Sequence, residues 1–211
     1  MKIEVKNLSK KFKNEIVLKN VNIELNEGHI YGFVGRNGSG KSVFLKMICG
    51  FYKPTDGNIL FDNIDIIKEK TYPPETRALI EKPNFISDLT GYENLKLLAE
   101  IQNKIGDDEI NEALKIVNLY ESKNKKYNKY SLGMKQKLGI AQVLMENPKL
   151  MIFDEPFNGI ETDTVKKLRK EFLKLKQQGK IIIISSHIKE DIEKLADEIY
   201  EFSDYTVKKI K

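Results

Sequence analysis

The sequence predicts an α/β fold in which a strand-rich lobe is interrupted by a helical segment. Near-continuous apolar runs at 149–155 and 180–186 are typical of parallel strands covered on both faces. Between about 83 and 147, apolar side chains recur at intervals of three and four residues, which indicates amphipathic helices. We therefore expect one domain, with an α/β lobe formed by 1–82 and 148–211 and a helical subdomain, 83–147, inserted between its halves.

The strands and helices are expected in a definite order. The segments "KIEVKNL" (2–8), "VNIELNEGHIYGFVG" (21–35) and "GNILFDN" (57–63) read as short strands bounded by turn residues. A helix follows Gly40, and later helices lie within the insertion and between the two late strands. The apolar faces of these helices carry Phe44, Leu45 and Ile48; Tyr92, Leu95, Leu98 and Ala99; Ile110, Ala113, Leu114 and Val117; and Val165, Leu168, Phe172 and Leu175.

The composition argues against several classes of function. The net charge of +5 comes from lysines that are interleaved with acidic residues, as in "ESKNKKYNKY" (121–130), and no cluster of arginine and aromatic residues accompanies them. We therefore expect a solvated surface and no nucleic-acid partner. No apolar stretch approaches the about 20 residues needed to cross a bilayer, so we expect a cytosolic, unprocessed chain. Cys49 is the single cysteine, which leaves no internal disulfide.

The stretch "GFVGRNGSGKSVFLKMICG" (32–50) has the pattern of a phosphate-binding loop. Gly35, Gly40, Lys41 and Ser42 match G-x-x-x-x-G-K-[ST] between an expected strand and an expected helix. Backbone N–H groups of such a loop surround phosphate oxygens, the lysine reaches the outer phosphates and the serine hydroxyl binds magnesium. A glycine-rich turn without chemistry is the alternative. The expected nucleotide-binding residues are Gly35, Arg36, Asn37, Gly38, Ser39, Gly40, Lys41, Ser42 and Val43.

A second acidic site follows the strand in "LMIFDEP" (150–156). Asp154 ends the apolar run, where it can hold Mg²⁺ together with Ser42. Glu155 comes next and can act as the general base that polarises an attacking water. An acidic turn without chemistry is less favoured, because both expected strands end at the edge where open α/β sheets bind ligands.

The segment "YSLGMKQKLGIAQVLMENPKLMIFDEP" (130–156) resembles the signature helix and Walker B strand of ATP-binding cassette (ABC) ATPases. The resemblance covers nearly the whole chain. It implies a P-loop NTPase fold of the ABC ATPase type, with a mixed sheet, an antiparallel β part and an inserted helical subdomain, and it implies ATP and Mg²⁺ as cofactors. It also implies a head-to-tail homodimer or heterodimer, because the signature of one subunit closes on the phosphate loop of another. The residues concerned are Phe12 for adenine stacking, Ser131, Leu132, Gly133 and Met134 for the signature in trans, 158–161 for the D-loop and His187 for the switch histidine.

The chain departs from the usual family pattern in three places. The signature usually written LSGGQ reads YSLGM, and the D-loop ends in Glu161 instead of aspartate. Glu81 appears where a glutamine is usual, and it could serve catalysis or bind Mg²⁺. The surrounding "ALIEKPNFISDLTGYENL" resembles the ABC-2 exporter ATPases of bacitracin and lantibiotic resistance. That likeness implies membrane-spanning permease partners and a cytoplasmic location, peripheral to the inner face of the cell membrane.

Two other functions stay open from the sequence. One is a nucleotide-gated module that hydrolyses ATP weakly, and the other is a soluble ABC ATPase of the iron–sulfur assembly type. Phe85, Ile86 and Leu89 follow Glu81 on an otherwise polar loop. They are expected either to dock a helix of the membrane partner or to pack the hinge between the lobes.

Overall fold

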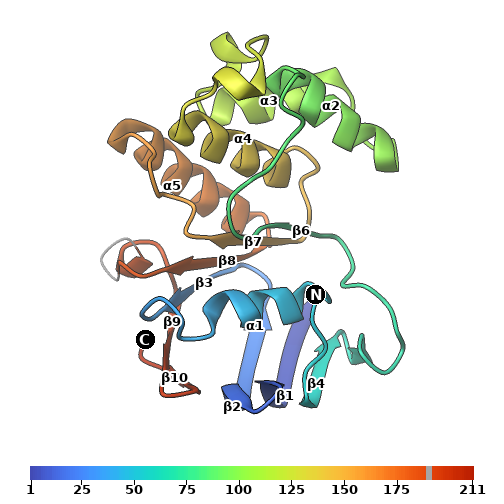
Figure 1. The fold of residues 1–211 in the computed structure, drawn as a ribbon, viewed down its shortest axis with the longest axis vertical. Coiled ribbons are helices and arrows are strands. Elements are labelled where there is room, and N and C mark those ends of the chain that lie inside the picture. The colour runs from blue at the N-terminus through green and yellow to red at the C-terminus, as the bar shows by residue number, and fades with distance from the viewer. Residues whose placement is uncertain (189–191) are drawn as a thin grey trace.

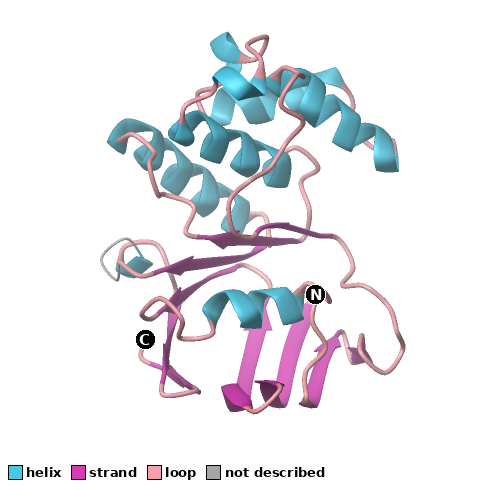
Figure 2. Cartoon of the chain, in the orientation of Figure 1, coloured by secondary structure: helices cyan, strands magenta, loops and turns pink. Residues whose placement is uncertain are grey.

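The computed structural model describes residues 1–188 and 192–211 and has three layers (Figure 1). A six-stranded sheet in the order β10-β9-β3-β8-β7-β6 lies in the middle, and a four-stranded antiparallel sheet, β2-β1-β4-β5, lies below it with helix α1 between the two. Figure 2 shows the remaining long helices gathered on the opposite side of the central sheet. This mixed sheet, parallel except for β10, confirms the predicted α/β class.

The strands and helices have the following bounds. The strands are β1 (Lys2–Phe12), β2 (Glu15–Asn26), β3 (His29–Val34), β4 (Asp56–Phe61), β5 (Ile64–Asp65), β6 (Thr76–Leu79), β7 (Leu150–Asp154), β8 (Ile181–Ser186), β9 (Glu198–Ser203) and β10 (Thr206–Lys209). The helices are α1 (Lys41–Ile48), α2 (Gly91–Gln102), α3 (Asp107–Ile116), α4 (Leu132–Leu144) and α5 (Thr162–Gln177), with short 3₁₀ turns η1 (Tyr120–Ser122) and η2 (Tyr127–Lys129).

Two differences from the sequence-based expectation concern strands. The apolar stretch 21–35 is divided by a turn at Glu27 and Gly28, so that β2 joins the antiparallel sheet and β3 the central one. The patterns described above do not single out β6, β9 or β10. These strands are short or partly polar, and their pairing with distant strands supplies the order that their own sequences signal only weakly.

The central strands are buried on both faces, which explains their continuous apolar sequences. In β8, Ile182 and Ile184 pack against the layer formed by α2 to α5, whereas Ile181 and Ile183 pack against α1 and the antiparallel sheet. All four isoleucines are fully buried. Because successive strand residues point to opposite faces, each face needs its own apolar set. Within the described residues, no helix combines the length and apolar character needed to span a bilayer.

Helices α2, α3 and α4 form the part of the chain that lies between β6 and β7. Helix α2 begins with a capping box in which Thr90 accepts from the Glu93 N–H and Glu93 accepts from the Thr90 N–H. Phe85, in the segment that leads into α2, is half-buried with its ring edge on Tyr127, at 5.4 Å between ring centroids. Phe85 therefore packs against the core beneath the helices of the 83–147 segment, whereas the neighbouring Ile86 is exposed, and docking of a partner on this loop stays a prediction.

Candidate functional site

The register of the parallel strands brings the polar residues of the site together. Strands β3, β8 and β7 lie side by side, with Val34 opposite Ser186 and Asp154 opposite Ser185. The carboxyl ends of all three strands therefore reach the same edge of the sheet. The glycine-rich loop leaves β3 at this edge and returns as α1, the arrangement in which open α/β sheets bind ligands.

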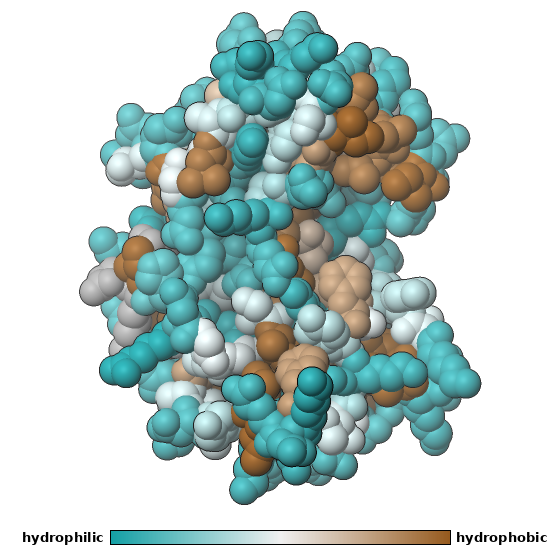
Figure 3. Space-filling view, viewed as in Figure 1, coloured by the Kyte–Doolittle hydropathy of each residue, from teal (hydrophilic) through white to brown (hydrophobic). Residues whose placement is uncertain are grey.

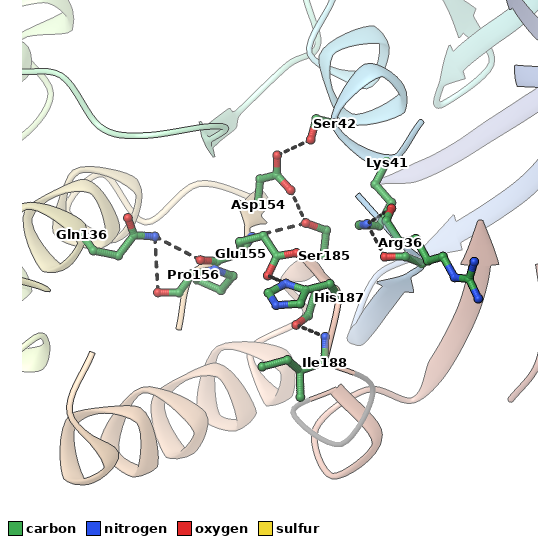
Figure 4. A network of polar contacts seen from close by, with 12 residues as sticks. Arg36, Lys41, Ser42, Gln136, Asp154, Glu155, Pro156, Ser185, His187 and Ile188 are labelled. Atoms are coloured by element: carbon green, nitrogen blue, oxygen red, sulfur yellow. Dashed lines mark hydrogen bonds and ion pairs between the residues drawn. The ribbon is translucent and has the colours of Figure 1, made fainter. Parts of the chain in front are cut away.

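The loop before α1 has the shape of an anion cradle. Gly40 precedes the helix with φ 98°, a conformation that favours glycine, and a Cβ there would meet Cδ2 of Leu18 at 3.0 Å. The Lys41 Nζ donates to the carbonyls of Gly35 (2.6 Å) and Arg36 (3.1 Å), which places the ammonium inside the loop (Figure 4). Burial lowers the pKa of Lys41, and the nearby Glu155 and Asp154 carboxylates oppose that shift.

A buried hydroxyl in the same loop fits a phosphate ligand. The Ser39 Oγ is buried and has no hydrogen-bond partner within the described part of the chain. Buried polar groups are nearly always paired, so a hydroxyl left without a partner inside a turn of backbone N–H groups suits an acceptor such as a phosphate oxygen. The predicted nucleotide-binding residues 35–43 thus form one continuous loop and helix start around Lys41.

The acidic part of the site is built on Asp154, the last residue of β7. The Ser42 Oγ donates to its Oδ2 at 2.6 Å, and the Ser185 Oγ of β8 donates to its Oδ1 (Figure 4). The Asp154 side chain is buried, so two hydroxyl donors compensate the loss of hydration of its charge. Strand register, which the local sequence does not reveal, selects Ser185 for this role.

Glu155 stands next to this network in a strained conformation. Its φ is 51°, unusual for a residue with a side chain, and its N–H donates to the Ser185 carbonyl at 3.1 Å. The Nδ1 of His187 lies 2.9 Å from the Glu155 Oε2. Figure 4 shows His187 against Glu155, beside the Asp154 network. The structure thus brings the predicted base and the predicted switch histidine into contact.

The oxygens of Ser42 and Asp154 fit Mg²⁺. Hard oxygen ligands suit this ion, which usually takes one or two protein carboxylates together with waters and substrate phosphates. Of the residues described, no three or more His, Cys, Asp or Glu side chains group into a metal cage. The donor set is therefore suited to an ion shared with a phosphate ligand.

Glu81 lies apart from these two ligands and has a different partner. It follows β6 with φ 65°, and its Oε1 accepts a hydrogen bond from the Nζ of Lys46 on α1. This hydrogen bond raises the pKa of Lys46. The structure therefore does not bring Glu81 into contact with Ser42 or Asp154, and the role of Glu81 as a metal ligand stays a prediction.

Phe12 lies at the end of β1 and presents an exposed ring. The ring of Tyr52 meets it edge-on at 5.5 Å between centroids, and the Lys10 Nζ lies 4.7 Å from the Phe12 centroid. An accessible aromatic ring of this kind can stack on a base. Tyr52 was not among the predicted site residues, and it holds one edge of Phe12.

The predicted signature residues open helix α4, which lies across the central sheet from α1 (Figure 1). Ser131 is the N-cap, its Oγ accepting from the Met134 N–H at 3.2 Å, and Leu132 is 64% exposed. A Cβ at Gly133 would lie 2.4 Å from the Gly159 carbonyl oxygen, so only glycine allows α4 to approach the 158–161 segment this closely. Within one chain the signature does not complete the phosphate loop.

Two further side chains of α4, not predicted, join it to the acidic segment. The Gln136 Nε2 donates to the Glu155 carbonyl at 3.2 Å, as Figure 4 shows. The Lys137 Nζ lies 2.6 Å from the Glu161 Oε2, and this hydrogen bond lowers the pKa of Glu161. The glutamate that replaces the usual D-loop aspartate thus has a partner in its own chain.

Replacing Ser185 with alanine tests the support of Asp154. Ser185→Ala removes a hydroxyl donor from a buried carboxylate, so we expect the free energy of unfolding to fall by about 1–3 kcal/mol. Urea denaturation measures the loss. Ser9→Ala is the control, because the Ser9 Oγ accepts a hydrogen bond from a backbone N–H, that of Asn20, at a more exposed site. A loss for Ser185→Ala no larger than the loss for Ser9→Ala would show that Asp154 does not depend on this hydroxyl.

Curated relatives of this chain include transport ATP-binding proteins. The bacitracin transport ATP-binding protein BcrA of Enterococcus faecalis is 40% identical over 199 residues, which make up 93% of this chain but only 65% of the relative. The lantibiotic transport ATP-binding protein SrtF of Streptococcus pyogenes is 34% identical over 92% of this chain and 84% of its own length. This chain therefore spans less than two thirds of the bacitracin relative.

Solved structures with the same fold are also ABC cassettes. One is the ATP-binding subunit of an ABC transporter. The alignment covers 99% of this chain and 89% of the subunit, with a TM-score of 0.88 and 28% identity. A second match is a dimeric cassette in a post-hydrolysis state bound to ADP and Pi. The alignment covers 99% of this chain and 98% of the cassette, with a TM-score of 0.87 and 28% identity. The family model described as ABC transporter matches residues 18–158, well over half of the sequence. With the resemblance seen in the sequence thus confirmed, the chain belongs to the ABC transporter family, as an ABC ATPase.

Proposed function

We propose that the protein binds and hydrolyses ATP as the nucleotide-binding subunit of an ABC exporter of antimicrobial-peptide or drug type. The observation that carries this proposal is the single network that joins the phosphate loop, Asp154 and Glu155 at one sheet edge. The cargo class is supported by the bacitracin and lantibiotic transport relatives. Dimer closure around ATP would drive separate membrane subunits from the cytoplasmic face of the membrane.

The side chains divide the chemistry among them. Lys41 and the loop N–H groups would bind the phosphates. Ser42 and Asp154 would hold Mg²⁺, and that ion would supply electrostatic stabilisation of the transferring phosphoryl group. Glu155 takes a proton from the attacking water. As it does so, the oxygen of that water forms a bond to the γ-phosphorus, and the bond between the γ-phosphorus and the oxygen of the ADP leaving group breaks. His187 positions the Glu155 carboxylate through their 2.9 Å contact.

A weakly hydrolysing, nucleotide-gated module is the second candidate. The bond from Lys137 to Glu161 favours it, because a carboxylate held within its own chain is less free to reach across a dimer. The soluble iron–sulfur alternative has no comparable support, since the relatives described above are transport proteins. Turnover decides between the first two candidates.

The Glu155→Gln variant should keep nucleotide binding and lose turnover by roughly 100-fold or more, because an amide cannot take up the proton. Lys41→Ala should instead weaken binding itself. ATP hydrolysis and fluorescent-nucleotide titration measure the two effects. Glu171→Gln is the matched control, since Glu171 lies on α5 and pairs with Lys174. The catalytic assignment is lost if Glu155→Gln hydrolyses ATP at the wild-type rate. Wild-type turnover of about 1 s⁻¹ or faster, an ordinary enzymatic rate, contradicts the weakly hydrolysing candidate.

Dimer formation follows from the placement of the signature. Ser131 and the exposed Leu132 lie on the far side of the central sheet from α1, so a second chain must supply a signature to each phosphate loop. A dimeric cassette is among the structures with this fold. We propose that ATP closes two such chains head to tail, as a homodimer or with a related chain.

Sedimentation tests this assembly. ATP should shift Glu155→Gln from monomer to dimer, and the added substitution Ser131→Arg should block the shift, because the larger side chain fills the space where phosphate approaches. Asn128→Arg, an exposed change on the same lobe, should not block it. A dimer that survives Ser131→Arg, or a monomer at every concentration of chain and Mg-ATP, would contradict the homodimer.

A membrane subunit needs a surface on this chain, and we propose the junction of the two lobes. A pocket of about 680 Å³ lies there, lined by the turn after α1, residues 72–78 and the ends of α2 and α4. Tyr72, which lines it, is 77% exposed, and Ile101, which precedes the lining residue Gln102 on α2, is 75% exposed. Figure 3 shows apolar atoms gathered over α2. Large exposed apolar side chains beside a pocket suit the apolar face of a partner helix.

Ile101→Asp should abolish co-purification with a co-expressed permease subunit, because a charge would be buried at the contact. Leu173→Asp on α5 is the control, since Leu173 is an exposed leucine away from this pocket. Basal ATP hydrolysis should persist in both variants. Equal loss with both variants, or loss with neither, would remove the docking assignment.

A further inference from the structure

Lys46 and Glu81 form an ion pair near Ser42 and Asp154, the residues proposed above to hold Mg²⁺. Lys46 lies four residues after Ser42, on the same face of α1 one turn further along the helix. Glu81 follows β6, and β6 pairs in parallel with β7 so that Leu79 lies opposite Phe153. Glu81 and Asp154 therefore leave the same edge of the sheet. The Lys46 ammonium bonds to Glu81, and Asp154 is close enough to contribute to the raised pKa of Lys46.

The two partners differ in how firmly they are held. The Lys46 side chain is 21% exposed, and its Nζ lies 5.5 Å from the centroid of the Tyr52 ring. The Glu81 side chain is 65% exposed and lies on a connecting segment with a left-handed backbone conformation. Lys46 is thus the fixed partner and Glu81 the movable one.

We infer that Lys46 is a positioning residue that holds the Glu81 carboxylate away from Mg²⁺, so that Glu81 approaches the ion only by leaving Lys46. The inference rests on the proposed function. With the pair intact, the lysine neutralises a carboxylate that would otherwise repel the phosphates of ATP. With the pair broken, the carboxylate is free to reach a cation. Lys46 therefore sets how strongly nucleotide binding depends on Mg²⁺.

The same lysine connects the two ends of the nucleotide site. Its ammonium bonds to Glu81 on one side and lies over Tyr52 on the other, and the Tyr52 ring meets Phe12 edge-on. A movement of Glu81 away from Lys46 changes the charge beside the aromatic pair where a base would stack. Release of Glu81 therefore alters the electrostatic environment of the base as well as that of the phosphates.

The test compares binding of a non-hydrolysable ATP analogue with excess Mg²⁺ and with chelator, by calorimetry on the full chain. The ratio of the two dissociation constants, chelator over Mg²⁺, reports the dependence on the ion. Lys46→Met should raise this ratio roughly tenfold, the size expected for one charge interaction at a partly exposed site. Lys46→Arg should leave the ratio of dissociation constants at its wild-type value, because arginine keeps the positive charge. Glu81→Gln should lower the ratio.

A double-mutant cycle separates the ion pair from other roles of Lys46. In the Glu81→Gln background, Lys46→Met should change the ratio less than about twofold. Lys10→Met is the matched control, since Lys10 also lies over Phe12 and Tyr52 but bonds to the Lys53 carbonyl. It should leave the ratio unchanged. Circular dichroism melting curves check that each variant is folded.

Each outcome decides the inference. If Lys46→Met weakens binding equally with and without Mg²⁺, or acts equally in the Glu81→Gln background, the lysine serves packing or general charge and the inference is wrong. Failure of the wild type to bind the analogue at all would instead overturn the proposed function. The two failures are therefore distinguishable.

Discussion

The arrangement of the site depends on one buried carboxylate at the end of the central strand. Asp154 accepts hydrogen bonds from Ser42 at the start of α1 and from Ser185 at the end of β8. An isolated buried charge is costly, and these two donors make the position tolerable. They also fix the phosphate loop against the sheet. The glycine-rich loop and the segment that carries the proposed catalytic residue are therefore held together by the same hydrogen bonds that stabilise the charge.

The charged side chains around this carboxylate are compensated by different kinds of partner. Lys41 lies within the loop and bonds to its carbonyls, Asp154 is bound by neutral hydroxyls, and Lys46 and Glu81 neutralise each other further along α1. Each cation thus has an oxygen partner before phosphate arrives. Because ligand oxygens would compete with these partners, binding exchanges existing bonds for new ones and does not simply add them. Such an exchange gives the site a means of responding to nucleotide.

The local motifs and the distant contacts differ in how far sequence can reveal them. The loop at 35–43 and the Asp154 and Glu155 pair are predictable, because their chemistry and their flanking elements are contiguous in the chain. Ser185, Gln136 and Lys46 are not, because each meets its partner only through strand register or helix packing. Strands β6, β9 and β10 escape prediction for the same reason, since distant pairing stabilises them.

The segment that follows β7 links helix α4 to the central sheet. On one side the Glu155 backbone is held by Ser185 of the central sheet, and on the other its carbonyl accepts from Gln136 of α4. Close packing of Gly133 on Gly159 and the bond from Lys137 to Glu161 fasten the same helix to the same segment. A rotation of α4 must either carry this segment with it or break these contacts. Because Gln136 bonds to the carbonyl of Glu155, a displacement of α4 acts on the backbone that carries the proposed catalytic carboxylate, which already has the unusual φ of 51°.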